Sequence, residues 1–124
     1  MKLNQITIPV SDMARSRAFY VALGFHRIVD ETHYCRFLAP EGDTTLSLSL
    51  TDQPITPGAV LYLETQDVDA EVERLVSAGL TLLDPPTDQR WLWREALFAD
   101  PDGHKIKIFN GGTARLDPPW KVTD

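Results

Sequence analysis

Residues 98–109 read FADPDGHKIKIF, and this stretch decides the fold. Pro101 fixes φ for the second position of a tight turn, Asp100 can bond the backbone two residues on, and Gly103 supplies a positive φ. After the turn, two isoleucines alternate with two lysines, which is the period of a strand with one face on an apolar core. The stretch therefore predicts a β-hairpin, and we expect function on the lysine side of its second strand.

The chain has 124 residues, of which 43% are hydrophobic and 24% charged, and this predicts one compact globular domain. No apolar run approaches the roughly eighteen residues of a membrane span, and the N-terminus turns polar too soon for a secretory signal. The net charge of −6 argues against nucleic acid or an anionic membrane as the main partner. A single cysteine, Cys35, is expected to be a buried apolar residue in a reducing, cytoplasmic environment.

The first half of the chain predicts the element order βαβββ. Four stretches with alternating or β-forming side chains are expected to be strands: 3–10, 26–31, 33–38 and 45–50. A helix is expected at 13–23, because Asp12 can cap its start and Gly24 can end it. A turn is expected at 39–43.

The same pattern begins again after a linker at 53–58 that contains two prolines. Asp67 takes the place of Asp12 at a second helix start, and Gly79 follows Gly24 by 55 residues. The second helix, expected at 68–78, has four residues on its apolar side: Val68, Val72, Leu75 and Val76. Further strands are expected at 60–65, 80–83 and 91–99, with a turn at 84–86.

The sequence thus predicts an α+β fold of two βαβββ modules, at about 1–52 and 59–110, followed by a tail at 111–124. Neither module has enough elements to bury both faces of its own sheet, so we expect eight strands with the helices on the outer, apolar face. The opposite, polar face suits the wall of a concave pocket, although an exposed strand face would show the same alternation. Trp120 either pins the tail to a module or lies in a disordered segment.

Three features at these separations make the chain resemble the vicinal oxygen chelate superfamily, which contains glyoxalase I, extradiol dioxygenases, and bleomycin- and fosfomycin-resistance proteins. These are the paired modules, the opening IPVSDMARSRAFY at 8–20 with LGF at 23–25, and the closing DPDGH at 100–104. The resemblance covers the chain up to Asn110. It implies a cupped eight-stranded mixed sheet around a ligand cavity, in a homodimer, with modules paired within one chain or swapped between two.

The resemblance also bears on metal binding. Family members with metal chemistry hold the ion on the first and last strands of each module, and these positions fall here on Gln5, Ser47, Val60 and Lys107. Val60 has no donor atom, and Lys107 places an ammonium where a carboxylate would neutralise the cation. We therefore expect no metal and no other cofactor, with a divalent metal as the alternative. The histidines share no ligand spacing and are expected on the surface: His26, His33 and His104.

Lys107 is the most informative departure from the family pattern. Inside a cavity it needs a counter-charge, which is Glu64, Glu95 or an anionic ligand. One alternative is that this counter-charge forms an ion pair with Lys107 that merely closes the pocket. The other is that Lys107 anchors the carboxylate or phosphate group of a small organic ligand. The candidate pocket residues are Gln5, Thr7, Ser47, Ser49, Val60, Tyr62, Glu64, Trp91, Trp93, Glu95 and Lys107, with His33 and Arg36 as weaker candidates.

Three functions stay open. The first is a small-molecule-binding protein of the glyoxalase/bleomycin-resistance type, without the catalytic metal, that binds a small anionic or aromatic organic ligand in the concave sheet. The second is a metal-dependent lyase or isomerase resembling lactoylglutathione lyase, or a dioxygenase. The third is a structural dimer without a working pocket. The expected partners are a small organic molecule and a second copy of the chain, with no nucleic acid and no membrane.

Overall fold

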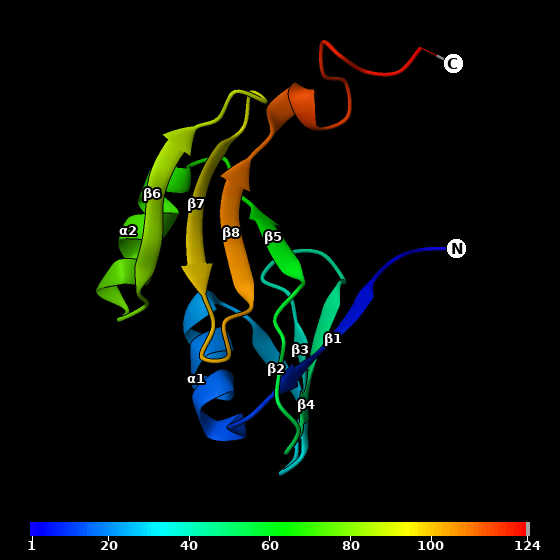
Figure 1. Ribbon diagram of the computed structural model, residues 1–124, viewed down its shortest axis with the longest axis vertical. Coiled ribbons are helices and arrows are strands. Elements are labelled where there is room, and N and C mark those ends of the chain that lie inside the picture. The colour runs from blue at the N-terminus through cyan, green and yellow to red at the C-terminus, as the bar shows by residue number, and fades with distance from the viewer. Residues whose placement is uncertain (124) are drawn as a thin grey trace. The chain divides into compact units, whose positions relative to one another are not determined.

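The computed structural model describes residues 1–123, and its elements follow the predicted order (Figure 1). The first module contains β1 (Gln5–Val10), α1 (Met13–Leu23), β2 (His26–Asp30), β3 (Tyr34–Leu38) and β4 (Thr45–Leu50). The second contains β5 (Val60–Glu64), α2 (Val68–Ser77), β6 (Leu82–Asp88), β7 (Arg94–Ala99) and β8 (Lys105–Asn110), followed by the 3-10 helix η1 (Gly112–Arg115). The prediction of two βαβββ modules in an α+β fold is confirmed.

Each module forms a four-stranded mixed sheet, in the orders β1-β4-β3-β2 and β5-β8-β7-β6. The first strand of each module pairs in parallel with the last, and the other pairs are antiparallel. Gln5 lies opposite Thr45 in one sheet, and Val60 lies opposite Lys105 in the other. Ser47 and Lys107, each two residues further along, therefore occupy equivalent positions in the two sheets.

The predicted hairpin turn is present between β7 and β8. The backbone N–H of Asp102 donates to Oδ1 of Asp100 over 3.0 Å, and the N–H of Gly103 donates to the carbonyl of Asp100 over 3.0 Å. Gly103 has a φ of +89°, a value that residues with a side chain rarely adopt. The local chemistry of the turn is therefore as the sequence predicts.

The chain divides into two compact units. The first unit contains Met1–Gly58 together with the turn Asp100–Gly103, and the second contains Ala59–Ala99 and the residues from 104 on. Two carboxylates of the turn form hydrogen bonds with residues of the first unit. Asp100 accepts a buried hydrogen bond of 2.7 Å from the Tyr20 hydroxyl, and Asp102 accepts hydrogen bonds from the N–H and hydroxyl of Ser11.

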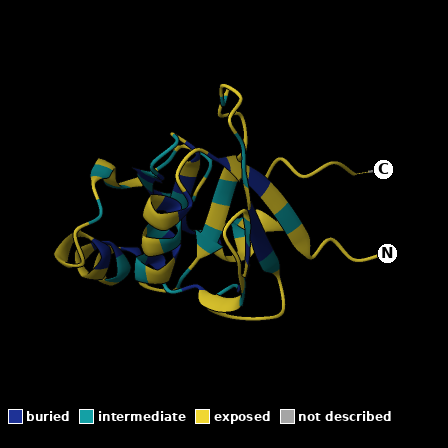
Figure 2. Cartoon of the chain, turned by 90° about the horizontal axis from the view of Figure 1, so that it is seen from below, coloured by how far each residue is buried: buried dark blue, intermediate teal, exposed yellow. Residues whose placement is uncertain are grey.

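Both helices begin at the predicted residue. α1 also ends as predicted, and α2 ends at Ser77, one residue before the predicted end. Asp12 accepts a hydrogen bond from the N–H of Arg15, and Asp67 accepts one from the N–H of Ala70, so both act as N-caps. A glycine with positive φ follows each helix. Each helix carries buried residues on one side and exposed residues on the other (Figure 2). β1 and β3 alternate between buried and more exposed residues.

The first unit has an aromatic core. The rings of Tyr20, Phe25 and Phe37 lie with their centroids 5.7–6.5 Å apart, and all three residues are buried. The edge-to-face arrangement of Tyr20 on Phe25 is the geometry that aromatic pairs favour. Cys35 lies in the same sheet and is fully buried as predicted, and burial raises the pKa of its thiol.

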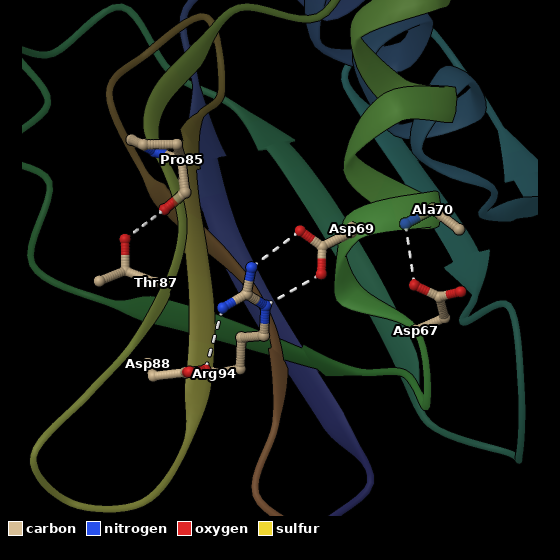
Figure 3. A network of polar contacts seen from close by, with 7 residues as sticks. All are labelled: Asp67, Asp69, Ala70, Pro85, Thr87, Asp88 and Arg94. Carbon is tan, nitrogen blue, oxygen red and sulfur yellow. Dashed lines mark hydrogen bonds and ion pairs between the residues drawn. The ribbon is translucent and has the colours of Figure 1, made fainter.

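Arg94 joins three elements of the second unit (Figure 3). Its Nε and Nη2 donate to the carboxylate of Asp69 in α2 over 2.9 Å each, and its Nη1 donates to Asp88 in β6 over 3.0 Å. These bonds lower the pKa of the Asp69 carboxyl, chiefly through the hydrogen bond from Arg94. Arg94 therefore lies on the helix side of β7, and its neighbour Glu95 points to the opposite face, as the predicted alternation requires.

The boundaries of two strands were predicted wrongly. The segment 84–86 is part of β6 and not a turn, because β6 is an edge strand with irregular pairing on both sides of Asp84, where prolines need not donate to a neighbour. β7 begins at Arg94 and not at residue 91. Backbone hydrogen bonds between Gln89 and Trp93 and between Leu92 and Gln89 close a turn there, with Leu92 at a φ of +70°.

The burial of His104 and of Val76 differs from the prediction. His104 is buried, contrary to the expectation of a surface histidine, because it falls on the same side of the chain as Ile106 and Ile108 by the period of two. Val76 is exposed and does not belong to the buried stripe of α2. Trp120 is also exposed. Within the described residues, no helix combines the length and apolar character needed to cross a membrane.

Candidate functional site

The candidate residues fall on the sheet faces opposite the helices, and they gather in two clusters, one in each unit. In the first unit Ser47 is fully buried, while Gln5, Thr7 and Ser49 are exposed. In the second unit Glu95 is buried, and the others are half-buried or exposed: Val60, Tyr62, Glu64, Trp91, Trp93 and Lys107.

The Tyr34 cluster of the first unit consists of Gln5, Tyr34, Arg36, Thr45 and Ser47. Gln5 Nε2 donates to Ser47 Oγ over 2.7 Å, and the Thr45 hydroxyl donates to Gln5 Oε1. The oxygens of Ser47 and Tyr34 share a hydrogen bond of 2.6 Å, and Arg36 Nε donates to the Tyr34 oxygen over 2.9 Å. These bonds lower the pKa of the Tyr34 hydroxyl, first through the hydrogen bond to Ser47 and then through Arg36.

The Lys107 cluster of the second unit consists of Tyr62, Trp91, Trp93, Glu95, Lys107 and Phe109. Lys107 Nζ donates to Glu95 Oε2 over 2.9 Å, and Trp91 Nε1 donates to Glu95 Oε1 over 2.8 Å. Both carboxylate oxygens of the buried Glu95 are thus satisfied. The predicted counter-charge of Lys107 is Glu95, and the hydrogen bond to Glu95 raises the pKa of the Lys107 ammonium.

Three aromatic rings of the Lys107 cluster pack on one another. The Tyr62 ring meets Phe109 edge to face at 5.3 Å and Trp93 edge to face at 6.0 Å, and the Trp93 and Phe109 centroids are 4.9 Å apart. Lys107 Nζ lies 5.5 Å from the centroid of Tyr62, within the range of a cation–π contact. Tyr62 keeps 46% of its surface exposed, so an aromatic ring beside an ammonium remains accessible.

Glu64 has other partners than Lys107. One of its carboxylate oxygens accepts from the N–H of Gly111 over 3.0 Å, and the other lies 3.5 Å from Nε of Arg115 in η1. These contacts hold the start of the tail against β5. Gly111 has no room for a side chain, since an added Cβ would lie 2.9 Å from Cβ of Arg115.

The residues at the four metal positions that the resemblance implies do not fit a divalent cation. The amide of Gln5 is already bonded to Thr45 and Ser47, and Val60 has no donor atom. Lys107 is a cation whose counter-charge is Glu95. Over residues 1–123, no group of three or more His, Cys, Asp or Glu side chains is placed to hold a metal ion. The donor set lacks the anionic or neutral ligands that such an ion requires.

The sequence reasoning missed two members of these clusters. Tyr34 was not singled out, although it alternates with the buried residues Cys35 and Phe37 and therefore shares a strand face with Arg36. Phe109 was treated only as the end of a strand. The register that brings Tyr34 opposite Ser49 and Arg36 opposite Ser47 depends on how β3 pairs with β4, which no local pattern fixes.

Comparison with known proteins agrees with the fold and the modules. A family model described as the Glyoxalase/Bleomycin resistance protein/Dioxygenase superfamily matches residues 2–108. The crystal structure of a glyoxalase/bleomycin resistance protein from Streptomyces sp. CB03234 is 33% identical, with a TM-score of 0.68 over 86% of this chain and 98% of that one. A superfamily member from Sphaerobacter thermophilus is 28% identical, with a TM-score of 0.74 over 89% and 97%.

An uncharacterised protein of Mycobacterium bovis is 36% identical over 63 residues. That match covers 51% of this chain and 39% of the mycobacterial protein, so the chain spans less than half of that relative's length. The family model covers most of the chain, and the Streptomyces structure is matched over nearly its whole length. The chain therefore belongs to the glyoxalase/bleomycin resistance protein/dioxygenase superfamily.

Proposed function

We propose that this protein binds a small aromatic carboxylate at the Lys107 cluster, without a catalytic metal. The observation that carries the proposal is the half-exposed ring of Tyr62 beside Lys107, at the strand position where the family's metal chemistry would need a carboxylate. A flat ring can stack on Tyr62 and Trp93, and the ammonium can donate its remaining N–H groups to a ligand oxygen.

The charges around the cluster favour an acidic ligand. The buried carboxylate of Glu95 neutralises Lys107. Lys105 lies two residues before Lys107 in β8, on the same face of the strand. Lys105 is exposed, and it forms no ion pair with a carboxylate in the described part of the chain. The face therefore keeps one uncompensated positive charge on a chain whose net charge is −6. Long-range attraction of acidic ligands to this face is expected to weaken with salt.

The absence of a catalytic metal is part of the proposal. It is supported by the side chains at the four positions where the family resemblance implies metal ligands. Val60 has no donor atom there, and Lys107 carries a positive charge. Elemental analysis of untreated protein should find no stoichiometric Ni, Zn, Fe or Mn. A stoichiometric metal would contradict the proposal and favour the lyase, isomerase or dioxygenase alternative. A homodimer and a cytoplasmic location remain predictions, and sedimentation velocity would test the first.

Binding can be followed by tryptophan fluorescence. Trp91 and Trp93 belong to the cluster, and Trp120→Phe removes the exposed tryptophan of the tail from the signal. Benzoate should quench or shift this emission and bind more tightly than benzyl alcohol, which has the ring without the charge. Equal affinities for benzoate and benzyl alcohol would show that the Lys107 ammonium does not bind the carboxylate.

The matched variants separate recognition from folding. Lys107→Met alone would leave the carboxylate of Glu95 buried without its cation, so it is combined with Glu95→Gln, whose amide oxygen still accepts from Trp91. The double variant should bind benzoate about tenfold more weakly, as expected for one lost charge-assisted hydrogen bond. Lys105→Met is the comparison, because it removes the uncompensated charge of the face and leaves the contacts of Lys107 intact. It should weaken benzoate binding less than the double variant does, and chiefly at low salt. An equal loss in Lys105→Met, or no loss in the double variant, would contradict the proposal.

A further inference from the structure

The Tyr34 cluster contains a phenol whose oxygen is held by two neighbours. Tyr34 lies on β3 and Ser47 on β4, and their side-chain oxygens are 2.6 Å apart. Arg36, two residues along β3, donates from Nε to the Tyr34 oxygen over 2.9 Å. Ser47 is fully buried, while Tyr34 is half-buried and Arg36 is exposed. The cluster therefore runs from the interior of the first unit to its surface.

The direction of these hydrogen bonds follows from the donors available. The Gln5 amide nitrogen lies 3.3 Å from the carbonyl oxygen of Ile6 and donates to Ser47 Oγ over 2.7 Å. An amide nitrogen cannot accept, so the proton of the Ser47 hydroxyl needs another partner. Among residues 1–123, the other side-chain contact of Ser47 Oγ is the Tyr34 oxygen. Ser47 therefore donates to Tyr34, since a buried hydroxyl proton without an acceptor is costly.

Tyr34 thus accepts from Ser47 and from Arg36, and its own O–H is directed away from both. No acceptor for that proton is recorded within the described chain. The terminal amino groups of the exposed Arg36 likewise have no carboxylate partner in residues 1–123. One O–H donor and the forked end of a guanidinium lie side by side at the surface of the sheet.

We propose that Tyr34 and Arg36 form a carboxylate-binding site, in which Tyr34 donates its O–H and Arg36 its terminal N–H groups to the two oxygens of a small organic acid. Arg–carboxylate pairs are frequently bidentate and stronger than neutral hydrogen bonds. The proposal goes beyond the function proposed above, because it concerns the first unit and uses no residue of the Lys107 cluster.

Carboxylate binding at this site should weaken as the pH rises and Tyr34 ionises. The charged neighbours of Tyr34 are Arg36 on its own strand and Glu31 just before it. The residues paired with Tyr34 and Arg36 on the adjacent strands are uncharged: Ser47, Ser49 and Val29. The pKa of Tyr34 is lowered by the bond to Ser47 and by Arg36. Carboxylate binding is therefore present below that pKa and lost as the pH rises through it, because a phenolate has no proton to donate.

Linkage gives the test, since a ligand that needs the phenol must raise its pKa. Tyrosinate absorbance is titrated in sodium benzoate and in sodium chloride of equal ionic strength. The ionisation step of Tyr34 is identified as the one that is missing in Tyr34→Phe. Benzoate at ten times its Kd should move the midpoint upward by about one pH unit. An unchanged midpoint would overturn the proposal.

Two arginine variants supply the matched control. Arg36→Gln should raise the Tyr34 midpoint and abolish the benzoate effect, whereas Arg90→Gln, which removes an exposed arginine of the second unit, should leave both unchanged. A benzoate effect that survives in Arg36→Gln, or disappears equally in Arg90→Gln, would count against the site.

Acetate separates this site from the function proposed above. It carries the carboxylate without the ring, so it should raise the Tyr34 midpoint even if the tryptophan emission does not respond. That result would support the Tyr34 site whatever happens at the Lys107 cluster. A change in tryptophan emission with benzoate and an unmoved Tyr34 midpoint would leave the Lys107 proposal standing and overturn this one.

Discussion

The Tyr20 side chain is fully buried, and its hydroxyl donates to Oδ2 of Asp100 over 2.7 Å. Asp100 keeps only 5% of its surface exposed, so this carboxylate oxygen cannot exchange its partner freely for water. Burial and the negative charge of Asp100 raise the pKa of Tyr20 above its usual range. The Tyr20 hydroxyl therefore holds the turn in place through Asp100, a contact that the local turn signals Asp100, Pro101 and Gly103 do not predict.

Tyr20→Phe should reduce the free energy of unfolding at neutral pH by about 1–3 kcal/mol, the cost of leaving a buried polar atom without its donor. The contribution of Tyr20 is complete below pH about 10, where an unfolded tyrosine ionises, and is lost as the pH rises through the raised folded pKa. Urea denaturation at neutral and alkaline pH measures both effects. The difference between wild type and variant should shrink above pH about 10.

Tyr62→Phe is the control, since Tyr62 is largely exposed and water can replace its hydroxyl contacts. A loss of stability in Tyr62→Phe as large as in Tyr20→Phe would mean that the buried bond to Asp100 is not what matters. A constant difference between Tyr20→Phe and wild type across the alkaline range would contradict the pKa argument.

At the scale of the element, α2 begins with two acidic contacts of different kinds (Figure 3). Asp67 caps the helix by accepting from the N–H of Ala70 over 3.0 Å, whereas Asp69 binds Arg94 of β7. The first contact belongs to the helix alone, and the second ties the helix to the sheet. Asp67 therefore stabilises the helix itself, and Asp69 stabilises the packing of the helix on the sheet.

Asp67→Ala should destabilise the protein by about 1 kcal/mol, because the first turn of α2 loses an acceptor for one of its unpaired N–H groups. Asp67→Asn should cost much less, since asparagine is an equally good N-cap. Urea denaturation of the two variants gives the comparison. If the asparagine variant is as unstable as the alanine variant, the charge and not the cap is responsible.

The element scale also shows where sequence reasoning is weakest. Both helices have local start and stop signals in their own residues, and both were placed to within one residue. β6 has no such signal, because its two prolines are tolerated only at a sheet edge. Whether a strand is an edge strand depends on its neighbours, which the local sequence does not contain.

At the scale of the whole molecule, the turn Asp100–Gly103 belongs to the first unit, although β7 and β8, which it connects along the chain, belong to the second. Ser11 contributes its N–H and its hydroxyl to Asp102, so the start of α1 is bonded to this turn. A chain that shares one segment between two units has a structural reason to unfold them together.

We expect one cooperative transition. All three tryptophans lie in the second unit, so their emission reports on that unit, while hydrogen exchange of α1 and β4 reports on the first. Both should give the same free energy of unfolding. Asp102→Ala should lower the exchange protection of α1 by about 1–2 kcal/mol, through loss of the bonds from Ser11. Two separate transitions in the wild type would contradict the expectation.

Asp43→Ala is the matched control for Asp102→Ala. Asp43 lies in the equivalent turn of the first module, where its ion pair with Lys2 is exposed on both sides. Exposed pairs contribute little, so this variant should leave the exchange protection of α1 unchanged from wild type. An equal loss of α1 protection in the two variants would contradict a specific role of the bonds between Asp102 and Ser11.

The sequence by itself determined the two βαβββ modules, both helices with their caps, the hairpin turn, and Glu95 as one of three counter-charges for Lys107. These features depend on spacing and on residues close in sequence, so local chemistry specifies them. The tertiary structure alone decided that β6 is an edge strand that includes residues 84–86, and that Tyr34 meets Ser47 across two paired strands. Those outcomes depend on strand pairing and register, which join residues far apart in the chain, and a local pattern carries no information about which distant strand lies beside it.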